Sequence, residues 1–410
     1  MDILISGASV AGTALAFWLR HAGHAVTVVE RAPAVRDGGY AIDVRGTALR
    51  VAERMGIADR ARRAGTDTLG TSFVNAAGKR IATLPLGFGV LSPDDIEIMK
   101  GDLTRLLYDT VPGGVEWIFG DTVTALDQGA GGVRVTFARS APRGFDLVLG
   151  ADGLHSAVRA LAFGPPERFV HDLGSRMAIF TAPNELGIER WQLIHNAPGR
   201  VASVKTDPGN ATIKVNLLFG GTGGTGGADH RDRDAQRQHV AAAFEGCGWH
   251  VPRLLEHLRT APDFYYAPNA QVRMDAWTRG RVALVGDAGY CPSPLTGQGT
   301  GLALVGAYTL ARELAAAGDE HVAAFARYDT VLRDFVEVNQ RAALAPAKGF
   351  APRTAREVWL RDLSIRMLPH VPWRHRIFEA MTRDAKRASE AFELCTDDAH
   401  LLRIGGDTSM

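Results

Sequence analysis

Residues 2–12 read Asp-Ile-Leu-Ile-Ser-Gly-Ala-Ser-Val-Ala-Gly, and this stretch decides the fold. It joins a short apolar run to a glycine-rich turn. The next residues, 13–22, are rich in Ala and Leu and end at Gly23, and a second apolar run covers 25–29. Strand, glycine turn, helix and second strand in this order predict a βαβ unit, which is the usual start of a parallel sheet.

The glycine turn is a variant of the dinucleotide-binding fingerprint GxGxxG, with Ser9 at the second glycine position. Gly7 allows the tight turn and Gly12 allows close packing of helix on strand, while a residue as small as Ser still lets the backbone approach a pyrophosphate. Glu30 follows the second apolar run, where a carboxylate can accept hydrogen bonds from both ribose hydroxyls. The alternative interpretation is an ordinary glycine-rich βα turn.

Composition limits the class of protein. A chain of 410 residues predicts two to three domains. Apolar residues make up 46% and charged residues 22%, which is typical of a soluble globular protein and excludes a disordered or fibrous one. The formal net charge of +1, without basic blocks, argues against a nucleic-acid partner. No apolar run is long enough to span a membrane, and the N-terminus does not resemble a signal peptide, so we expect a cytoplasmic protein.

The cysteines make a metal or disulfide site improbable. Cys247, Cys291 and Cys395 lie far apart in the sequence, and no CxxC pair occurs. An odd number of isolated cysteines predicts neither a disulfide framework nor a thiolate zinc site. We therefore expect no metal.

Two further motifs each follow an apolar run. The first is Gly-Ala-Asp-Gly-Leu-His-Ser-Ala-Val-Arg at 150–159, and the second is Gly-Asp-Ala at 286–288 with a Pro- and Gly-rich turn over 294–301. An Asp at the end of a strand can bind ribose or ribityl hydroxyls, and a glycine-rich helix start can face an anionic group. Each motif alone could be a capped turn, but three in this order are hard to assign to chance.

The rest of the chain predicts a discontinuous architecture. Alternating apolar and polar residues over 168–276 indicate antiparallel strands with one buried face. The segment 299–344 is interpreted as one long helical region and the tail 353–403 as mainly helical. The expected domains are 1–167 together with 277–345, then 168–276, and a C-terminal helical region, 346–410.

With these motifs the sequence resembles the class A FAD-dependent monooxygenases, the para-hydroxybenzoate hydroxylase-like group that includes tetracycline-modifying enzymes. The resemblance covers residues 2 to about 345. It implies an α/β fold: a Rossmann-like, GR2-type FAD-binding domain, an inserted antiparallel β-sheet substrate domain and C-terminal helices. It also implies an enzyme that uses FAD, NADPH or NADH, and O2 to hydroxylate an aromatic or polyketide-type small molecule through a flavin C4a-hydroperoxide. No catalytic side chain is expected, because the flavin carries the chemistry.

The resemblance also implies cofactor-binding residues. The ADP half of FAD would be held by Gly7, Ser9, Val10, Ala11, Gly12, Glu30 and Arg31. The remaining cofactor contacts would come from Asp43, Lys100, Arg105, Asp152, Arg159, Asp287, Pro294, Gly297, Gln298 and Gly299. Arg36 matches a basic residue implicated in nicotinamide-nucleotide contact, and the adjacent Gly38-Gly39 pair matches a flexible loop beside the flavin ring.

The sequence departs from the family pattern at two places. Lys100 stands where an Arg is usual, so it can neutralise a phosphate but cannot form a bidentate fork, and Arg105 could substitute for it. Tyr290 and Cys291 follow the Gly-Asp-Ala motif where Ala-His is frequent, which predicts a phenol and a thiol near the flavin. The alternative for Cys291 is a small, packed, apolar side chain.

Substrate contacts are expected on the strand-rich segment. The candidates are Arg176, Gln192 and Arg200, with His195 and Lys205 as further polar side chains. For each of these residues, a solvated sheet face is the alternative. The strand around Met177 lacks the amide side chain expected for a tetracycline.

Other functions of the same fold remain open. A flavin-dependent halogenase is disfavoured because no WxW pair occurs among the tryptophans. An epoxidase, a Baeyer–Villiger oxygenase, a reductase and a non-catalytic flavin-binding sensor remain alternatives. The sequence leaves open whether the protein is a monomer or a homodimer.

Overall fold

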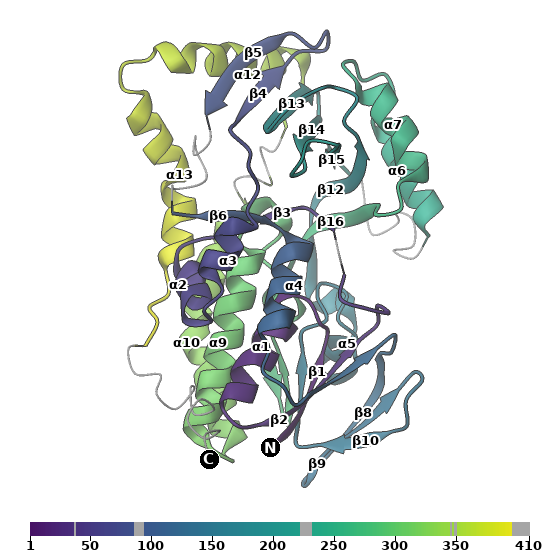
Figure 1. Cartoon of the computed structure of the whole chain (residues 1–410), viewed down its shortest axis with the longest axis vertical. Helices are drawn as coiled ribbons and strands as arrows, with labels where there is room; N and C mark the ends of the chain where they lie inside the picture. Colours follow the sequence, from purple (N-terminus) through teal and green to yellow (C-terminus); the bar gives the residue numbers. More distant parts are fainter. Residues whose placement is uncertain (37, 86–93, 222–231, 345–346, 348–350, 396–410) are drawn as a thin grey trace.

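The predicted βαβ unit is present in the computed structural model, which describes residues 1–36, 38–85, 94–221, 232–344, 347 and 351–395. Strands β1 (Asp2–Ser6) and β2 (Ala25–Glu30) pair in parallel, and helix α1 (Val10–His21) connects them. They belong to a six-stranded sheet in the order β17-β18-β11-β1-β2-β7 (Figure 1). Only β17, at one edge, is antiparallel to its neighbour. The other strands are β7 (Val115–Phe119), β11 (Leu147–Gly150), β17 (Thr278–Arg279) and β18 (Val282–Leu284).

Two long helices pack beside α1. Helix α9 covers Gly299–Ala317 and α10 covers His321–Ala342. The buried Trp18 of α1 meets the ring of Tyr308 on α9 edge-on, with the centroids 5.5 Å apart. The region 299–344 is helical, as predicted, but it consists of two helices and not one. Gly318 takes φ +61° and ψ −120°, which L side chains rarely adopt, and the chain reverses there.

A second, seven-stranded sheet has the order β16-β12-β15-β14-β13-β4-β5. It is antiparallel except where β13 and β4 pair in parallel. Its strands are β4 (Gly70–Val74), β5 (Arg80–Pro85), β12 (Val170–Pro183), β13 (Trp191–Ala197), β14 (Arg200–Thr206), β15 (Thr212–Gly220) and β16 (Tyr265–Val272). The expected boundary at residue 168 does not describe this sheet, because β4 and β5 come from the preceding segment. The segment 220–227, where six glycines in eight residues predict a flexible loop, lies mostly outside the described residues.

The two faces of this sheet differ. Helices α6 (Arg233–Ala243) and α7 (Val251–Thr260) cover what we call the outer face, where Phe180, Phe219 and Val204 are buried. Burying each such side chain stabilises the fold by about 1.5–3 kcal/mol. The opposite, inner face turns toward a two-stranded ribbon, because Lys205 on it pairs with Glu97 of that ribbon. Side chains alternate between the faces along each strand.

A two-stranded ribbon lies between the two sheets (Figure 1). It pairs β3 (Ala41–Val44) with β6 (Ile96–Met99) in antiparallel register, so that Asp43 lies opposite Glu97. Three helices adjoin the ribbon: α2 (Thr47–Arg54), α3 (Ala58–Arg63) and α4 (Lys100–Thr110). Two carboxylates on facing strands are therefore brought to the junction of the two sheets.

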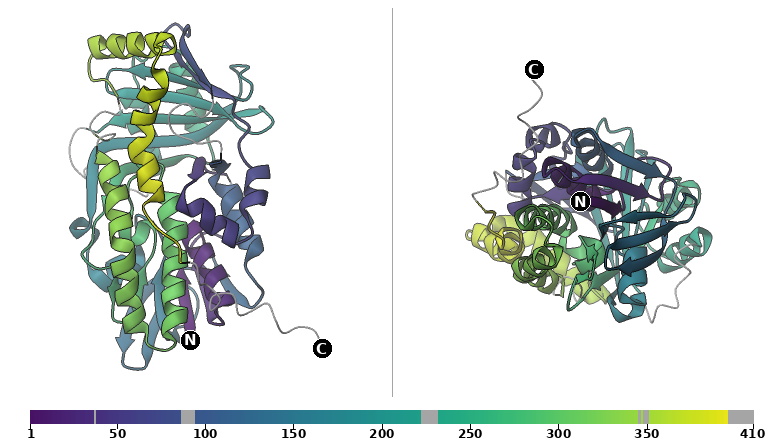
Figure 2. Two further views of the ribbon diagram at one scale, coloured as in Figure 1. Left: turned by 90° about the vertical axis from the view of Figure 1, so that its left-hand side faces the viewer. Right: turned by 90° about the horizontal axis from the view of Figure 1, so that it is seen from below.

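The C-terminal part is helical, as predicted. Helix α13 (Arg374–Glu390) runs beside α9 and α10 (Figure 2). The Asn339 side chain on α10 donates to the carbonyl oxygen of Ala388, and Gln298 donates to that of Ala385. The elements not yet named are β8 (Val123–Gly129), β9 (Gly132–Phe137), β10 (Arg143–Phe145), α5 (Ala157–Phe163), α8 (Asp287–Tyr290), α12 (Ala355–Met367) and three short 3-10 helices, η1 (Pro166–Arg168), η2 (Pro294–Thr296) and η3 (Leu368–His370). No helix in the described part of the chain has the length and apolar character needed to cross a membrane.

Candidate functional site

The three sequence motifs meet at one edge of the six-stranded sheet. The parallel strands β1, β2, β11 and β18 all end there, and backbone hydrogen bonds join the turns that follow them. The Gly7 N–H donates to Val29 at 2.7 Å, and the Ala151 N–H donates to Ser6 at 2.8 Å. Ligands of open α/β sheets bind outside the carboxyl ends of the strands. The structure thus gathers segments that are far apart in the sequence into one place.

The first and third motifs require glycine for packing. A Cβ on Gly7 would lie 2.5 Å from the carbonyl oxygen of Ala151, and the residue has φ +106°. A Cβ on Gly12 would lie 1.8 Å from the carbonyl oxygen of Gly7. A Cβ on Gly286 would meet that of Ala11 at 3.2 Å. The motifs therefore approach one another so closely that any side chain would force them apart.

Two helix N-termini at this edge fit the phosphate and ring portions of FAD. Helix α1 begins after Ser9 and α9 begins after Gln298, and neither residue caps its helix with a side-chain hydrogen bond. The first N–H groups of a helix have no partner within the helix and carry partial positive charge. Such ends accommodate anionic or polarised oxygen atoms. The donor chemistry of the site therefore fits a flavin dinucleotide.

Glu30 lies at the end of β2 as predicted, and its carboxylate organises the first turn. It accepts hydrogen bonds from the N–H groups of Ala8 and Ala32, both at 2.9 Å, and pairs with Arg36 at 3.1 Å. A carboxylate has lone pairs left for ribose hydroxyls after these contacts. Arg36 thus lies at the ribose end of the expected FAD site, and Arg31 is exposed beside it.

The second motif holds the site together from within. The Asp152 carboxylate accepts from the Ser156 hydroxyl and from the N–H groups of Ala157 and Val158, at the start of α5. Arg159 is fully buried and donates to the carbonyl oxygen of Ala288 at 2.8 Å. The contacts of both side chains in this structure are internal. Their predicted contacts with FAD or the nicotinamide nucleotide remain predictions.

Asp287 lies at the start of the third motif, with its carboxylate beside Gly299 at the beginning of α9. The charge of this carboxylate also affects the pKa of the neighbouring Cys291 thiol. Burial, together with the negative charge of Asp287, raises the pKa of Cys291 well above its ordinary value. Cys291 is therefore a protonated, packed thiol, in agreement with the apolar interpretation.

Tyr290 packs into the core against α9. It is fully buried, its hydroxyl is 2.9 Å from that of Tyr328, and a Cβ on Gly306 would overlap it. Its predicted position near the flavin remains a prediction.

The turn before α9, which we call the ring-side turn, comprises residues 293–298. Ser293 has φ +89° and Gly297 has φ +63°. Left-handed backbone at a non-glycine residue stores strain and often marks a functional site. Pro294 begins the short helix η2 between these two residues. The turn contains three of the predicted cofactor residues, Pro294, Gly297 and Gln298.

Two charged residues of the ribbon lie directly against the ring-side turn. The guanidinium of Arg45, which is 5% exposed, donates to the carbonyl oxygen of Thr296 at 3.0 Å and lies 3.6 Å from the Asp43 carboxylate. A Cβ on Gly297 would be 2.9 Å from Arg45 and 3.2 Å from Asp43. Burial raises the pKa of Asp43 to about 6, although the charge of Arg45 opposes the rise.

The Gly38-Gly39 loop connects the ribbon to both sheets. Gly38 and Gly39 have φ of +77° and +93°. The backbone N–H of Gly101, in the first turn of α4, donates to the Gly38 carbonyl at 2.8 Å. The following residue, Tyr40, lies under the Lys100 ammonium and 5.7 Å from the Tyr265 ring of β16. Lys100 is thus at the loop, whereas Arg105 lies exposed one turn along α4.

Of the three predicted substrate residues, only Gln192 lies on the inner face. It is in register with Lys205 on β14 and accepts from the Thr71 hydroxyl at 3.0 Å. Arg176 is on the outer face and pairs with Asp172 at 2.6 Å. Arg200, also on the outer face, donates to the Glu245 carbonyl at 2.9 Å. Strand alternation therefore separates these residues, and only Gln192 is carried forward as a substrate candidate.

The sequence interpretation missed several residues of the inner face and the ribbon. Asn216 lies on the inner face, and its Oδ1 atom is buried without a hydrogen-bond partner among the described residues. Glu97, on β6, pairs with Lys205 and with the Thr66 hydroxyl. A charge at the second position of an otherwise apolar strand, Ile-Glu-Ile-Met, was the available signal for Glu97. Arg45 had no comparable signal.

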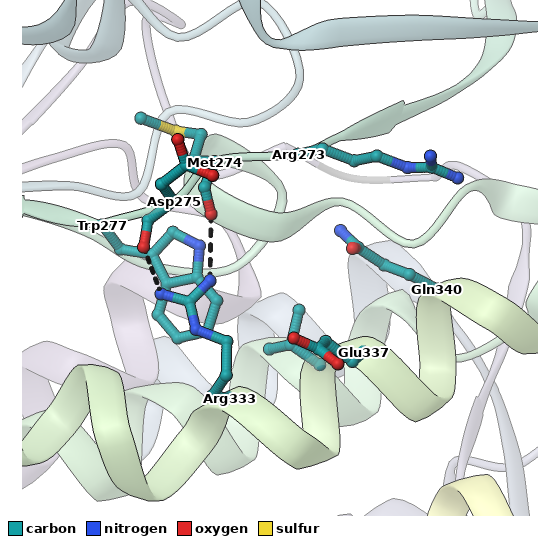
Figure 3. A pocket seen from close by; sticks show the side chains of 8 residues that line it. Arg273, Met274, Asp275, Trp277, Arg333, Glu337 and Gln340 are labelled. Atoms are coloured by element: carbon teal, nitrogen blue, oxygen red, sulfur yellow. Dashed lines mark hydrogen bonds between the residues drawn. The ribbon is translucent and has the colours of Figure 1, made fainter.

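A surface cavity of about 350 Å³ lies elsewhere, between residues 273–277 and α10 (Figure 3). Arg333 stacks on Trp277 at 3.9 Å and donates to the carbonyl oxygens of Met274 and Asp275. The residues that line this cavity belong neither to the three motifs nor to the inner face of the second sheet. The polar contacts within it are internal, so the cavity is separate from the candidate site.

Comparisons with known proteins agree with this geometry. A family model described as "FAD binding domain" matches residues 1–337. A flavin-dependent monooxygenase of Legionella longbeachae is 38% identical over 351 residues, which is 85% of this chain and 90% of that protein. An uncharacterised protein of Mycobacterium tuberculosis is 48% identical over 354 residues, 85% of this chain and 94% of that protein. The crystal structure of the tetracycline destructase Tet(51) aligns with a TM-score of 0.85 at 33% identity, covering 97% of this chain and 99% of that one.

Proposed function

Because this chain belongs to the class A FAD-dependent monooxygenases, we propose that it uses NADPH or NADH and O2 to hydroxylate an aromatic or polyketide-type small molecule. The observation that carries the proposal is the contact between the two halves of the site. Tyr40, next to the Gly38-Gly39 loop, contacts Tyr265 of the second sheet, and Lys205 on the inner face of that sheet pairs with Glu97 of the ribbon, whose other strand leads to Arg45 against the ring-side turn. A substrate on that face would lie beside the ring end of the cofactor.

The residues present fit FAD at three points. The N-terminus of α1 would hold the pyrophosphate, Glu30 the ribose, and Asp287 with the start of α9 the ribityl and ring portions. When bound and reduced, FAD supplies the electrons that activate O2 and delivers an electrophilic oxygen atom. The protein has to orient the substrate and exclude water from the reacting atoms.

The inner face would orient the substrate through a few polar groups on an otherwise apolar surface. Asn216 offers a buried acceptor without a partner, which costs about 1–3 kcal/mol until a donor reaches it. A substrate hydroxyl is one such donor, and Gln192 adds an amide two strands away on the same face. Phenols and enols carry this hydroxyl beside an electron-rich carbon. This chemistry supports an aromatic or polyketide-type substrate.

The proposal is tested with purified, FAD-loaded protein and a panel of phenols and polyketides, tetracycline among them. Oxidation of NADPH or NADH should accelerate with one class of compound. Mass spectrometry should then find a product that has gained one oxygen atom from isotopically labelled O2. A reductase would consume the nucleotide without incorporating the label, and a flavin-binding sensor would bind FAD without turnover. Either result would overturn the proposal.

The same experiment addresses the remaining alternatives. Epoxidation and Baeyer–Villiger insertion also add one oxygen atom, so the site of insertion has to be read from the product by NMR. An aromatic C–OH group supports hydroxylation, whereas an ester, a lactone or an epoxide supports the other two reactions.

A further inference from the structure

A row of charged side chains extends from the second sheet to the ring-side turn. Lys205, on the inner face, pairs with Glu97 on β6. Glu97 lies directly opposite Asp43 in the antiparallel ribbon. Asp43 in turn lies 3.6 Å from the guanidinium of Arg45, which donates to the carbonyl oxygen of Thr296. Four side chains, from β14, from β6, and from β3 and the residue after it, thus form one path between the two halves of the protein.

Every member of this path is shielded from solvent. Side-chain exposures are 13% for Lys205, 20% for Glu97, 17% for Asp43 and 5% for Arg45. Charges in such surroundings interact more strongly than exposed ones, because water screens them less. The path holds two cations and two carboxylates, so its charges balance only while all four are present. Removing one charge therefore alters the electrostatic environment of the other three.

We propose that Lys205, Glu97, Asp43 and Arg45 form one positioning network through which the second sheet fixes the ring-side turn. Arg45 holds the turn by its bond to Thr296, and Asp43 orients Arg45. Glu97 and Lys205 set the charge around Asp43 from the opposite side of the ribbon. The support of the FAD ring thereby depends on Lys205, a residue of the face that would meet the substrate. The inference rests on FAD binding at this site and not on the choice of substrate.

The network predicts that removing Lys205 and removing Glu97 shift the pKa of Asp43 in opposite directions. The groups that act on the Asp43 carboxyl are Arg45 and Lys205, which lower its pKa, and Glu97 and Asp95, which raise it. Removing the charge of Lys205 should raise the pKa of Asp43, and removing that of Glu97 should lower it. Because only the ionised carboxylate pairs with Arg45, FAD should bind more tightly above the pKa of Asp43 than below it.

The experiment is a fluorescence titration of the full-length apoprotein with FAD over a range of pH. For the wild type, the dissociation constant should rise as pH falls through about 6. K205M should weaken FAD binding by about three- to tenfold near neutral pH, which lies in the lower part of the range for residues coupled within one network. The pH at which the dissociation constant of K205M changes should be higher than in the wild type, and that of Glu97→Gln should be lower. We call this pH the inflection. D43N should remove the inflection, and K205R should restore wild-type behaviour.

The neighbouring Lys214 provides the matched control. It lies in register with Lys205 on the inner face but pairs with Asp263 and Asp207, outside the network. K214M should leave the inflection in place. Thermal melting shows whether each variant is folded, and if K205M is not, the shift in Glu97→Gln and the behaviour of K205R decide the question.

The proposed network would be overturned if the inflections of K205M and Glu97→Gln both stayed in place or both moved in the same direction. The readout involves no turnover. A failed network is therefore distinguishable from a wrong assignment of substrate or reaction.

Discussion

The guanidinium of Arg159 donates to the carbonyl oxygen of Ala288 at 2.8 Å, across 129 positions of sequence. A second bond runs from the same group to the carbonyl of Leu154 at 2.7 Å. The side chain is fully buried and lies between the second and third motifs. One residue thereby joins the turn after β11 to the turn after β18, and this link keeps the FAD-binding edge of the sheet in shape.

Replacing Arg159 by Met should destabilise the fold, because the side chain is buried and bonded on both sides. One buried and one partly buried carbonyl group would lose their donor, at about 1–3 kcal/mol for each group that is left unsatisfied. We expect the free energy of unfolding to fall by about 2–5 kcal/mol, measured by urea denaturation of the apoprotein. R341M is the control, because its ion pair with Glu337 is exposed and worth at most about 1 kcal/mol. Equal effects in the two variants would show that the buried bonds are unimportant.

Gly12→Ala should abolish FAD binding. The added Cβ would lie 1.8 Å from the carbonyl oxygen of Gly7, so α1 could not keep its position against the first turn. The pyrophosphate site depends on that position. Absorbance of the purified protein at the flavin bands measures the retained FAD. Gly113→Ala, where no atom lies within 4 Å of the new Cβ, should retain FAD like the wild type. A yellow G12A protein would contradict the assignment.

Gly39→Ala should slow reduction of the bound flavin by NADPH or NADH. Residue 39 has φ +93°, and a Cβ there would touch that of Lys100 at 3.4 Å, so the loop beside the expected ring site would be strained. We expect FAD to be retained and the reduction rate at saturating nucleotide to fall by about tenfold, which corresponds to about 1.4 kcal/mol. Stopped-flow absorbance measures the rate.

The control for this loop is Gly187→Ala. It imposes a comparable backbone strain, at φ +59°, far from the motifs and with no atom within 4 Å of the new Cβ. A wild-type reduction rate in G39A, or an equal slowing in both variants, would mean that the loop does not control access to the ring.

Gln192→Ala and Arg200→Ala should show which face of the second sheet binds the substrate. Once a substrate is identified, Q192A should raise its KM several-fold, because an amide on the inner face would be lost. R200A should leave KM unchanged and lower the melting temperature instead, because its bonds reach the outer helical layer at Glu245 and Cys247. Steady-state kinetics and thermal melting measure the two effects. A raised KM in R200A alone would reverse the assignment of the faces.

The candidate site could be predicted where the chemistry is local. Gly7, Gly12, Glu30 and Asp287 were found because strand, turn and acidic residue follow one another within a short segment. The same reasoning could not tell that Arg176 and Arg200 lie on the outer face of the second sheet. A strand changes the face of a side chain at every residue, and the face that a helical layer will cover depends on α6 and α7, which are distant in sequence.

The domain boundary failed for a related reason. Strand β4 precedes the strand-rich segment but pairs with β13 across more than a hundred positions, and β5 joins the sheet by pairing with β4. Hydrogen bonding between strands is non-local, so alternation within a segment identifies a strand without identifying its sheet. Gly318 is the opposite case: a single glycine in an alanine-rich segment carries too weak a local signal to locate a helix end.

The FAD-binding unit could be predicted from the order of residues, because its motifs act through backbone geometry that neighbouring residues dictate. The side chains that meet between the two sheets could be identified only in the folded protein. Arg45, Glu97 and Lys205 come from three separate segments, and their balance of charge exists only after the ribbon is placed against the second sheet. Long-range electrostatic contacts of this kind depend on distances that the order of residues does not encode.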